Sequence, residues 1–216
     1  NGTPPQANRE VSTDDIRSGR PRPNPAIAPF LAPDGDYDWL VRQVEYYCEE
    51  LAKAGRYRLY LWPPHVLLGT DGHALVGTIS EARLFHAYAR MAESWIELKG
   101  STPLTEYYSV VRPEVMTRFD GEPLARVNQD FINILNTSDA VLIAGQAASH
   151  CVKSTIEHLL EECDATLAAK VYILRDCMSS VTVPDPDRPG EFIFDFTPQA
   201  EEALQRFADA GMHVVE

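Results

Sequence analysis

Hydrophobic positions along this chain repeat at two spacings, and the two spacings alternate. From about Tyr37 to Ala54 apolar side chains recur every three to four residues and Gly55 follows, which predicts a helix with a glycine at its end. Short uninterrupted apolar runs, typical of buried strands, lie between the helical segments. The predicted strands are 58–62, 95–98, 141–144, 170–174 and 213–215, and the other predicted helices are 80–92, 124–135, the segment after Cys151 to about 163, and 198–210.

Strands that alternate with helices predict one class of fold. Right-handed crossovers place such strands in parallel, with helices on both faces of the sheet. We therefore expect an α/β fold, a doubly wound and mainly parallel sheet of five strands. Residues 1–35 are rich in Pro, Arg, Asn and Gly without periodicity, so we expect an extended, weakly ordered arm there and one domain over 36–216. The arm is expected to wrap a surface or a second subunit of a homo-oligomer.

One cysteine lies where a predicted strand ends and a predicted helix begins. The apolar run 140–144 leads to Gly145 and small residues, and Cys151 then precedes Val152 and Ile156 at helical spacing. Free N–H groups and the positive end of the helix dipole stabilise a thiolate at such a position, and they can also hold an oxyanion. A buried structural cysteine is the alternative. The strand–glycine–cysteine–helix context favours a nucleophile.

Composition narrows the class of protein. The 216 residues are 44% hydrophobic, which suits one α/β domain with a full core. The formal net charge of −13 argues against nucleic acid or an anionic membrane as a partner. No apolar run approaches the roughly 18 residues that span a bilayer, and no signal peptide is visible, so we expect a cytoplasmic location. Neither a disulfide framework nor a CxxC zinc spacing is present, so we interpret as reduced thiols Cys48, Cys151, Cys163 and Cys177.

Three segments together resemble one family of enzymes. Gly145-Gln-Ala-Ala-Ser-His-Cys151-Val is similar to the nucleophile motif of the nicotinamidase/isochorismatase-like cysteine hydrolases, which reads Gly-x-Ala-Thr-Asp-x-Cys-Val in many members. Trp62-Pro-Pro-His65 resembles the family's Trp-Pro-x-His metal segment, and Ile96-Glu-Leu-Lys99-Gly100 resembles the strand end that carries its catalytic lysine. The segments follow the family's order. The resemblance runs from about Arg56 to the C-terminus and is greatest to the longer, nicotinamidase-like members.

The resemblance implies a cysteine-dependent amidohydrolase that converts nicotinamide or a related small amide to the acid and ammonia through a thioester. It implies that Cys151 is the nucleophile and that Lys99 stabilises its thiolate. The N–H groups of Ala147 and Cys151 would form an oxyanion hole, beside a cis peptide bond between Gln146 and Ala147. It further implies that His65 is one ligand of a divalent metal ion (zinc, iron or manganese) whose remaining ligands lie outside this chain.

Several ring-bearing residues near these motifs are candidates for the wall of a substrate pocket. They can stack on a planar heteroaromatic ring, although aromatic residues in such positions also form cores. The candidates are Trp95, Tyr107, Tyr108 and His150. The sequence departs from the nicotinamidase pattern at two points that bear on substrate: Ala148-Ser149 stands where Thr-Asp is common, and Val66 where Cys is common.

The family's first strand and its Asp-x-His segment have no counterpart here, because no apolar run precedes Tyr37. We therefore expect that an N-terminal portion of the same protein, or a companion chain, supplies the catalytic aspartate, the other metal ligands and the first strand. Two alternatives stay open. One is another hydrolase of the superfamily, isochorismatase-like or carbamoyl-type. The other is a catalytically silent oligomeric or interaction module with the same fold.

Overall fold

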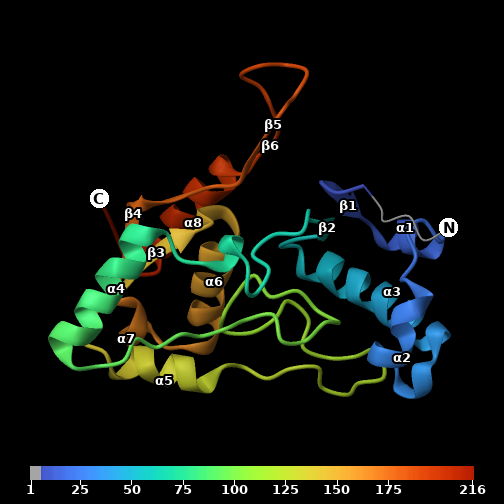
Figure 1. The fold of residues 1–216 in the computed structure, drawn as a ribbon, viewed down its shortest axis with the longest axis horizontal. Helices are drawn as coiled ribbons and strands as arrows, with labels where there is room; N and C mark the ends of the chain where they lie inside the picture. Colours follow the sequence, from blue (N-terminus) through green and yellow to red (C-terminus); the bar gives the residue numbers. More distant parts are fainter. Residues whose placement is uncertain (1–5) are drawn as a thin grey trace. The chain divides into compact units, whose positions relative to one another are not determined.

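The structure is a computed structural model that describes residues 6–216. The chain divides into two compact units, Asn1–Glu97 and Leu98–Glu216, each of which is described by itself (Figure 1). The first unit contains the strands β1 (Arg9–Val11) and β2 (Leu59–Leu61) and the helices α1 (Thr13–Arg17), α2 (Ala28–Leu31), α3 (Tyr37–Ala54) and α4 (Gly77–Arg90). Among the described residues, no helix is both long and apolar enough to cross a membrane.

Helix α3 confirms the prediction for 37–54. The Asp36 carboxylate accepts hydrogen bonds from the N–H groups of Asp38 and Trp39, at 2.8 and 3.1 Å, and so caps the first turn. At the other end Gly55 has a φ of 68°, a left-handed conformation that favours glycine, and its N–H donates to the Leu51 carbonyl. Both ends of this helix are therefore set by residues at its borders.

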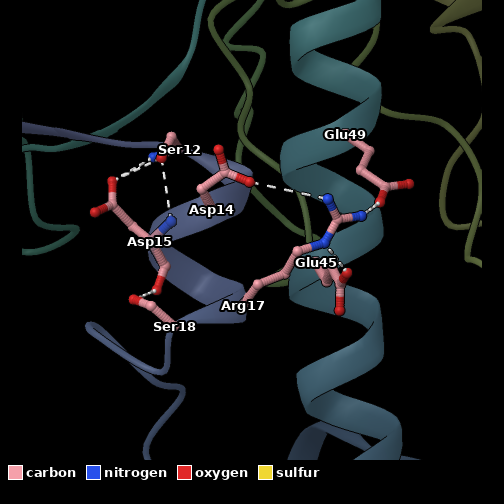
Figure 2. Close-up of polar contacts among 7 residues, drawn as sticks. All are labelled: Ser12, Asp14, Asp15, Arg17, Ser18, Glu45 and Glu49. Atoms are coloured by element: carbon pink, nitrogen blue, oxygen red, sulfur yellow. Dashed lines mark hydrogen bonds and ion pairs between the residues drawn. The ribbon is translucent and has the colours of Figure 1, made fainter.

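The segment before α3 corrects the prediction of an extended arm over 1–35, of which residues 1–5 lie outside the described part. Strand β1 pairs antiparallel with β2, with Val11 opposite Leu59. Helix α1 begins at a capping box, in which Ser12 and Asp15 each accept the other's backbone N–H. Figure 2 shows that its Arg17 reaches Glu45 and Glu49 of α3. Elements of three to five residues are too short to show periodicity. Caps and tertiary contacts, rather than a hydrophobic pattern, determine where they form.

Two of the five predicted strands lie outside the parallel sheet. The 58–62 prediction corresponds to β2, but β2 pairs with β1 in a two-stranded antiparallel sheet. The 95–98 segment forms no strand, and the helix predicted at 80–92 is α4. Periodicity identifies an apolar segment but not the neighbour whose backbone it pairs with, so it predicts neither the partner of β2 nor the missing pairing at 95–98.

The second unit confirms the α/β class with a parallel sheet. It has the strand order β3 (Val141–Gln146), β4 (Val171–Ser179) and β7 (His213–Val215), all parallel. The helices α5 (Gln129–Thr137), α6 (Lys153–Glu162), α7 (Ala165–Ala168) and α8 (Thr197–Asp209) share one core with this sheet. The most buried side chains of that core include Ile156, Leu159, Val171, Ile173 and Phe207.

The connections of the second unit position the site. The helix predicted at 124–135 begins only at Gln129, because Asn128 caps it by accepting the N–H of Phe131. Pairing between β3 and β4 shifts from Ile143–Ile173 to Gly145–Met178, a bulge close to the end of β3. The antiparallel hairpin of β5 (Thr182–Pro184) and β6 (Phe192–Asp195) extends away from the sheet, with residues 185–191 at its tip (Figure 1).

Candidate active site

Cys151 lies in a tight turn between β3 and α6. A π-helical turn, Ala148–Val152, joins the strand to the helix, which agrees with the prediction that Cys151 lies near a helix start. The N–H groups of His150 and Val152 both donate to the carbonyl of Ala147, at 3.0 and 3.2 Å. The peptide bond between Gln146 and Ala147 is cis, which confirms that expectation. Because Cys151 is the predicted nucleophile, we call residues 146–152 the nucleophile turn.

Lys99 and Cys151 meet although 52 residues separate them in sequence. The Lys99 Nζ lies 3.3 Å from the Cys151 Sγ, and the same ammonium donates to the carbonyl of Tyr107 at 2.6 Å. Lys99 belongs to an irregular segment rather than to the end of a strand. The Tyr107 carbonyl therefore fixes the ammonium in place of strand pairing. Lys99 is exposed and Cys151 is half-buried, so solvent reaches this contact.

Thr155 braces the nucleophile turn from the first turn of α6. Its hydroxyl donates to the Cys151 carbonyl at 2.7 Å and accepts the N–H of Val110 at 3.4 Å. It thus joins the cysteine to the segment that also contains Tyr107. Sequence reasoning missed Thr155, although a Thr four residues after a functional residue on a helix is a known signal, because its hydroxyl can bond the carbonyl four residues earlier.

Ser149 and His150 form a buried polar pair beside the cysteine. The Ser149 Oγ and the His150 Nδ1 are 2.9 Å apart, and the N–H of Val181 donates to the same hydroxyl at 3.0 Å. The His150 ring packs near two aromatic rings, with centroid distances of 5.6 Å to Tyr108 and 4.8 Å to Phe196. The residue is 5% exposed.

Burial keeps His150 neutral at ordinary pH. Loss of solvent, with a smaller contribution from the nearby Lys153 ammonium, lowers the pKa of His150 to about 4. Lys153 itself is almost fully buried and lies 3.7 Å from Glu157, which also accepts a hydrogen bond from Arg206 of α8 at 2.8 Å. The positive charge near the ring is therefore held in place by a carboxylate.

The other predicted pocket residues have different surroundings. Tyr108 is buried against His150, whereas Tyr107 is half-buried and its hydroxyl donates to Thr102 at 3.0 Å. Trp95 belongs to the first unit, is 64% exposed, and donates its indole N–H to Glu97.

A pocket of about 420 Å³ lies beside Ala148 of the nucleophile turn. Side chains from β4, β5 and α8 form its walls, including Arg175, Ser179, Thr182 and Thr197. None of the four predicted pocket residues is among the described residues that line it.

His65 belongs to the first unit, and its contacts are with its own segment. Its Nδ1 lies 2.7 Å from the Pro63 carbonyl, and its ring packs edge-on near Trp62 at 5.9 Å. Within residues 6–216, no three side chains of His, Cys, Asp or Glu converge as a metal site requires. The described residues around His65 therefore do not fit a resident metal ion.

Comparison with known proteins gives structural matches alone. No protein-family model matches the chain, and no curated protein matches it. The yeast nicotinamidase bound to the inhibitor nicotinaldehyde matches at 21% identity and a TM-score of 0.47, over 74% of this chain and 60% of that one. A Bacillus subtilis nicotinamidase/pyrazinamidase matches at 18% and 0.43 (87% and 93% covered), and the zinc complex of a Pyrococcus horikoshii pyrazinamidase at 20% and 0.42 (96% and 95%).

These solved structures are nicotinamidases and pyrazinamidases, the enzymes whose motifs the sequence resembles. The chain spans about 60% of the length of the yeast enzyme. With TM-scores below 0.5, the likeness gives no geometry for the site. The function is therefore argued from the chain's own residues.

Proposed function

We propose that this chain carries the nucleophile of a cysteine-dependent amidohydrolase that acts on nicotinamide or a related small amide. The observation that carries the proposal is the contact of 3.3 Å between the Lys99 ammonium and the Cys151 sulfur. A cation at this distance favours the thiolate, which is the nucleophilic form of cysteine. The three ordered motifs support the same assignment.

The chemistry proceeds in two halves. The Cys151 thiolate attacks the amide carbonyl carbon, and the oxyanion that forms accepts hydrogen bonds from the N–H groups of Ala147 and Cys151. The C–N bond then breaks, and ammonia leaves with a proton from a general acid, a role that the resemblance gives to an aspartate. Water attacks the resulting thioester, which releases the carboxylic acid and restores the thiolate.

The metal prediction stays with His65 alone, and no step above passes through a metal ion. The described residues do not complete a coordination sphere around His65. Assembly into a homo-oligomer, completion by an N-terminal portion or companion chain, and a cytoplasmic location also stay predictions. A small-molecule amide is the partner that the proposed chemistry requires.

Ammonia release from nicotinamide tests the proposal. With the N-terminal portion or companion chain that supplies the aspartate present, we expect the wild-type protein to turn over. Cys151→Ala should then lose about 10³-fold or more in kcat, because it removes the group that forms the thioester. Mass spectrometry of the protein quenched during turnover should show an acyl adduct on the peptide that contains Cys151. The matched control is Cys163→Ala, a half-buried cysteine on the border of α6, which should keep full activity. Activity that survives in Cys151→Ala would contradict the mechanism.

A further inference from the structure

The residue before the nucleophile has a role that the proposed chemistry leaves open. We propose that His150 is a positioning residue: its ring, held by Ser149, keeps the nucleophile turn in register with the segment that anchors Lys99. This inference rests on the proposed function, because it takes Cys151 as the nucleophile. It concerns an arrangement of side chains within the second unit alone.

The first step is the hydrogen-bonded link from Ser149. Its hydroxyl lies 2.9 Å from the His150 Nδ1 and accepts the N–H of Val181 at 3.0 Å. Val181 immediately precedes the β5–β6 hairpin. The pair therefore ties the nucleophile turn to the segment after β4, and it fixes the orientation of the imidazole ring.

The second step is the packing of that ring. The Tyr108 ring lies near it at an interplanar angle of 53°, and the Phe196 ring lies near it edge-on, at 80°. Tyr108 directly follows Tyr107, whose carbonyl accepts the Lys99 ammonium at 2.6 Å. The ring thus joins the backbone that anchors the ammonium to the turn that carries the sulfur.

The third step is the convergence of two braces on one segment. The Thr155 hydroxyl connects Val110 to the Cys151 carbonyl, and His150 connects Tyr108 to the residue before Cys151. Both braces therefore join residues 107–110 to the nucleophile turn, one from each side of the cysteine. Loss of the buried ring leaves a gap beside Tyr108, and the ammonium anchored on Tyr107 is then free to move away from the sulfur.

The role is positioning and not proton transfer. The ring is 5% exposed and flanked by Tyr108 and Phe196, so a substrate does not reach it directly. It is also neutral at the pH of ordinary assays. His150 therefore acts through the Lys99–Cys151 distance, and thiolate reactivity is the property that reports this distance.

The test is the alkylation rate of Cys151 by iodoacetamide at pH 7, measured by peptide mapping, with the exposed Cys177 of the same sample as the internal reference. We expect His150→Ala to lower the Cys151 rate about tenfold relative to Cys177, the size of effect that loss of a neighbouring cation has on a thiolate. His150→Phe keeps a ring between Tyr108 and Phe196, so it should lose less. In nicotinamide hydrolysis both variants should lower kcat and leave KM unchanged.

The matched control is His213→Ala. His213 also stacks on an aromatic ring, Tyr172 at 4.6 Å, and its Nε2 lies 3.0 Å from the Ala169 carbonyl, but it has no link to the nucleophile turn. Its alkylation ratio should equal that of the wild-type protein. If circular dichroism shows that His150→Ala does not fold, Ser149→Ala replaces it in the test. Ser149→Ala removes only a hydroxyl and should still lower the Cys151 alkylation rate relative to Cys177.

Lys99→Met separates failure of this inference from failure of the proposed function. If Lys99→Met lowers the Cys151 rate while folded His150→Ala and Ser149→Ala keep the wild-type rate, the positioning role is overturned and the proposed function stands. If Lys99→Met itself keeps the wild-type rate, the contact at 3.3 Å does not activate the thiol, and the proposed function fails with it.

Discussion

The nucleophile segment and the metal segment, both found by their motifs, differ in how much of a site each one builds. Around Cys151 the structure gathers a cation, a braced backbone and a buried ring, all within Leu98–Glu216. His65 instead bonds to Pro63, two residues earlier, and packs near its neighbour Trp62. A strand–turn–helix carries its geometry in one stretch of chain, whereas a metal site needs ligands from several stretches. A motif of the first kind is therefore the safer guide to function.

A second comparison, among the cysteines of the second unit, shows what is particular about Cys151. Burial, helped by Asp164 and Glu162, raises the pKa of the Cys163 thiol. Burial and the adjacent Asp176 likewise raise the pKa of the Cys177 thiol. Cys151 instead has an ammonium at 3.3 Å. Loss of solvent and nearby carboxylates therefore act on two of the thiols, whereas a cation lies next to the third.

Among substitutions that keep Cys151, the largest effect that we expect comes from Lys99→Met. The substitution keeps the length of the side chain and removes the charge next to the sulfur, so kcat/KM on nicotinamide should fall by about 10²–10³-fold. Steady-state measurement of ammonia release checks this. Lys170→Met is the matched control, because the Lys170 ammonium also bonds to carbonyls, those of Asn136 and Ser138 at 2.7 Å, but contacts no sulfur. Equal losses in the two variants would remove the distinction between the site and its surroundings.

The next effect concerns the stability of the folded state and its pH dependence. The pKa of His150 falls from 6.5 to about 4 on folding, so between these values the unfolded chain binds a proton that the folded chain does not. Stability from this group is fully present above pH 6.5 and is lost as the pH falls toward 4. The loss amounts to on the order of 3 kcal/mol.

Urea unfolding of wild type and His150→Phe between pH 7 and pH 4.5 isolates this contribution. Carboxylates titrate in both proteins, so only the difference between the two curves reports His150. The free energy of unfolding of the wild type minus that of His150→Phe should fall as the pH falls. Parallel curves would show that the ring is not buried as described.

The third effect is the selectivity of alkylation in the wild-type protein. At pH 7 Cys151 should react with iodoacetamide about tenfold faster than Cys163 or Cys177, since thiolate stabilisation by a cation favours it and carboxylates disfavour the others. Access alone predicts the opposite order for Cys151 and Cys177, because Cys177 is exposed and Cys151 is half-buried. Peptide mapping after limited labelling decides between charge and access. Uniform labelling would count against an activated thiol.

The sequence predicted those parts of the fold that neighbouring residues determine. Helix α3 lies between an N-terminal capping residue, Asp36, and a C-terminal glycine, Gly55, and both residues are visible in the sequence. The core strands of the parallel sheet are continuous apolar runs and were found for the same reason. The short elements β1 and α1, and the absence of a strand at 95–98, depend on contacts between distant segments, which periodicity does not encode.

The candidate site follows the same division. The motif placed Cys151 in its turn, and the resemblance supplied Lys99. The contacts of His150 with Tyr108 and Phe196 join segments more than 40 residues apart, so a local sequence pattern does not predict them. Thr155 is the intermediate case, because its spacing from Cys151 was readable in the sequence.

The smallest effect lies in the first unit, where we expect polar contacts to support stability and not chemistry. Ser12→Ala removes the hydroxyl that caps α1 (Figure 2), so the free energy of unfolding should fall by about 1 kcal/mol. The ion pairs of Arg17 with Glu45 and Glu49 remain, but exposed pairs contribute little and are screened by salt. Ser18→Ala is the control, since its hydroxyl donates to the Asp15 carbonyl from the C-terminal border of α1. If Ser18→Ala lowers the free energy of unfolding less than Ser12→Ala does, and both variants keep the Cys151 alkylation rate, the capping box stabilises the fold without affecting the thiol. A change in that rate would instead couple this helix to the thiol and end the contrast between the two units.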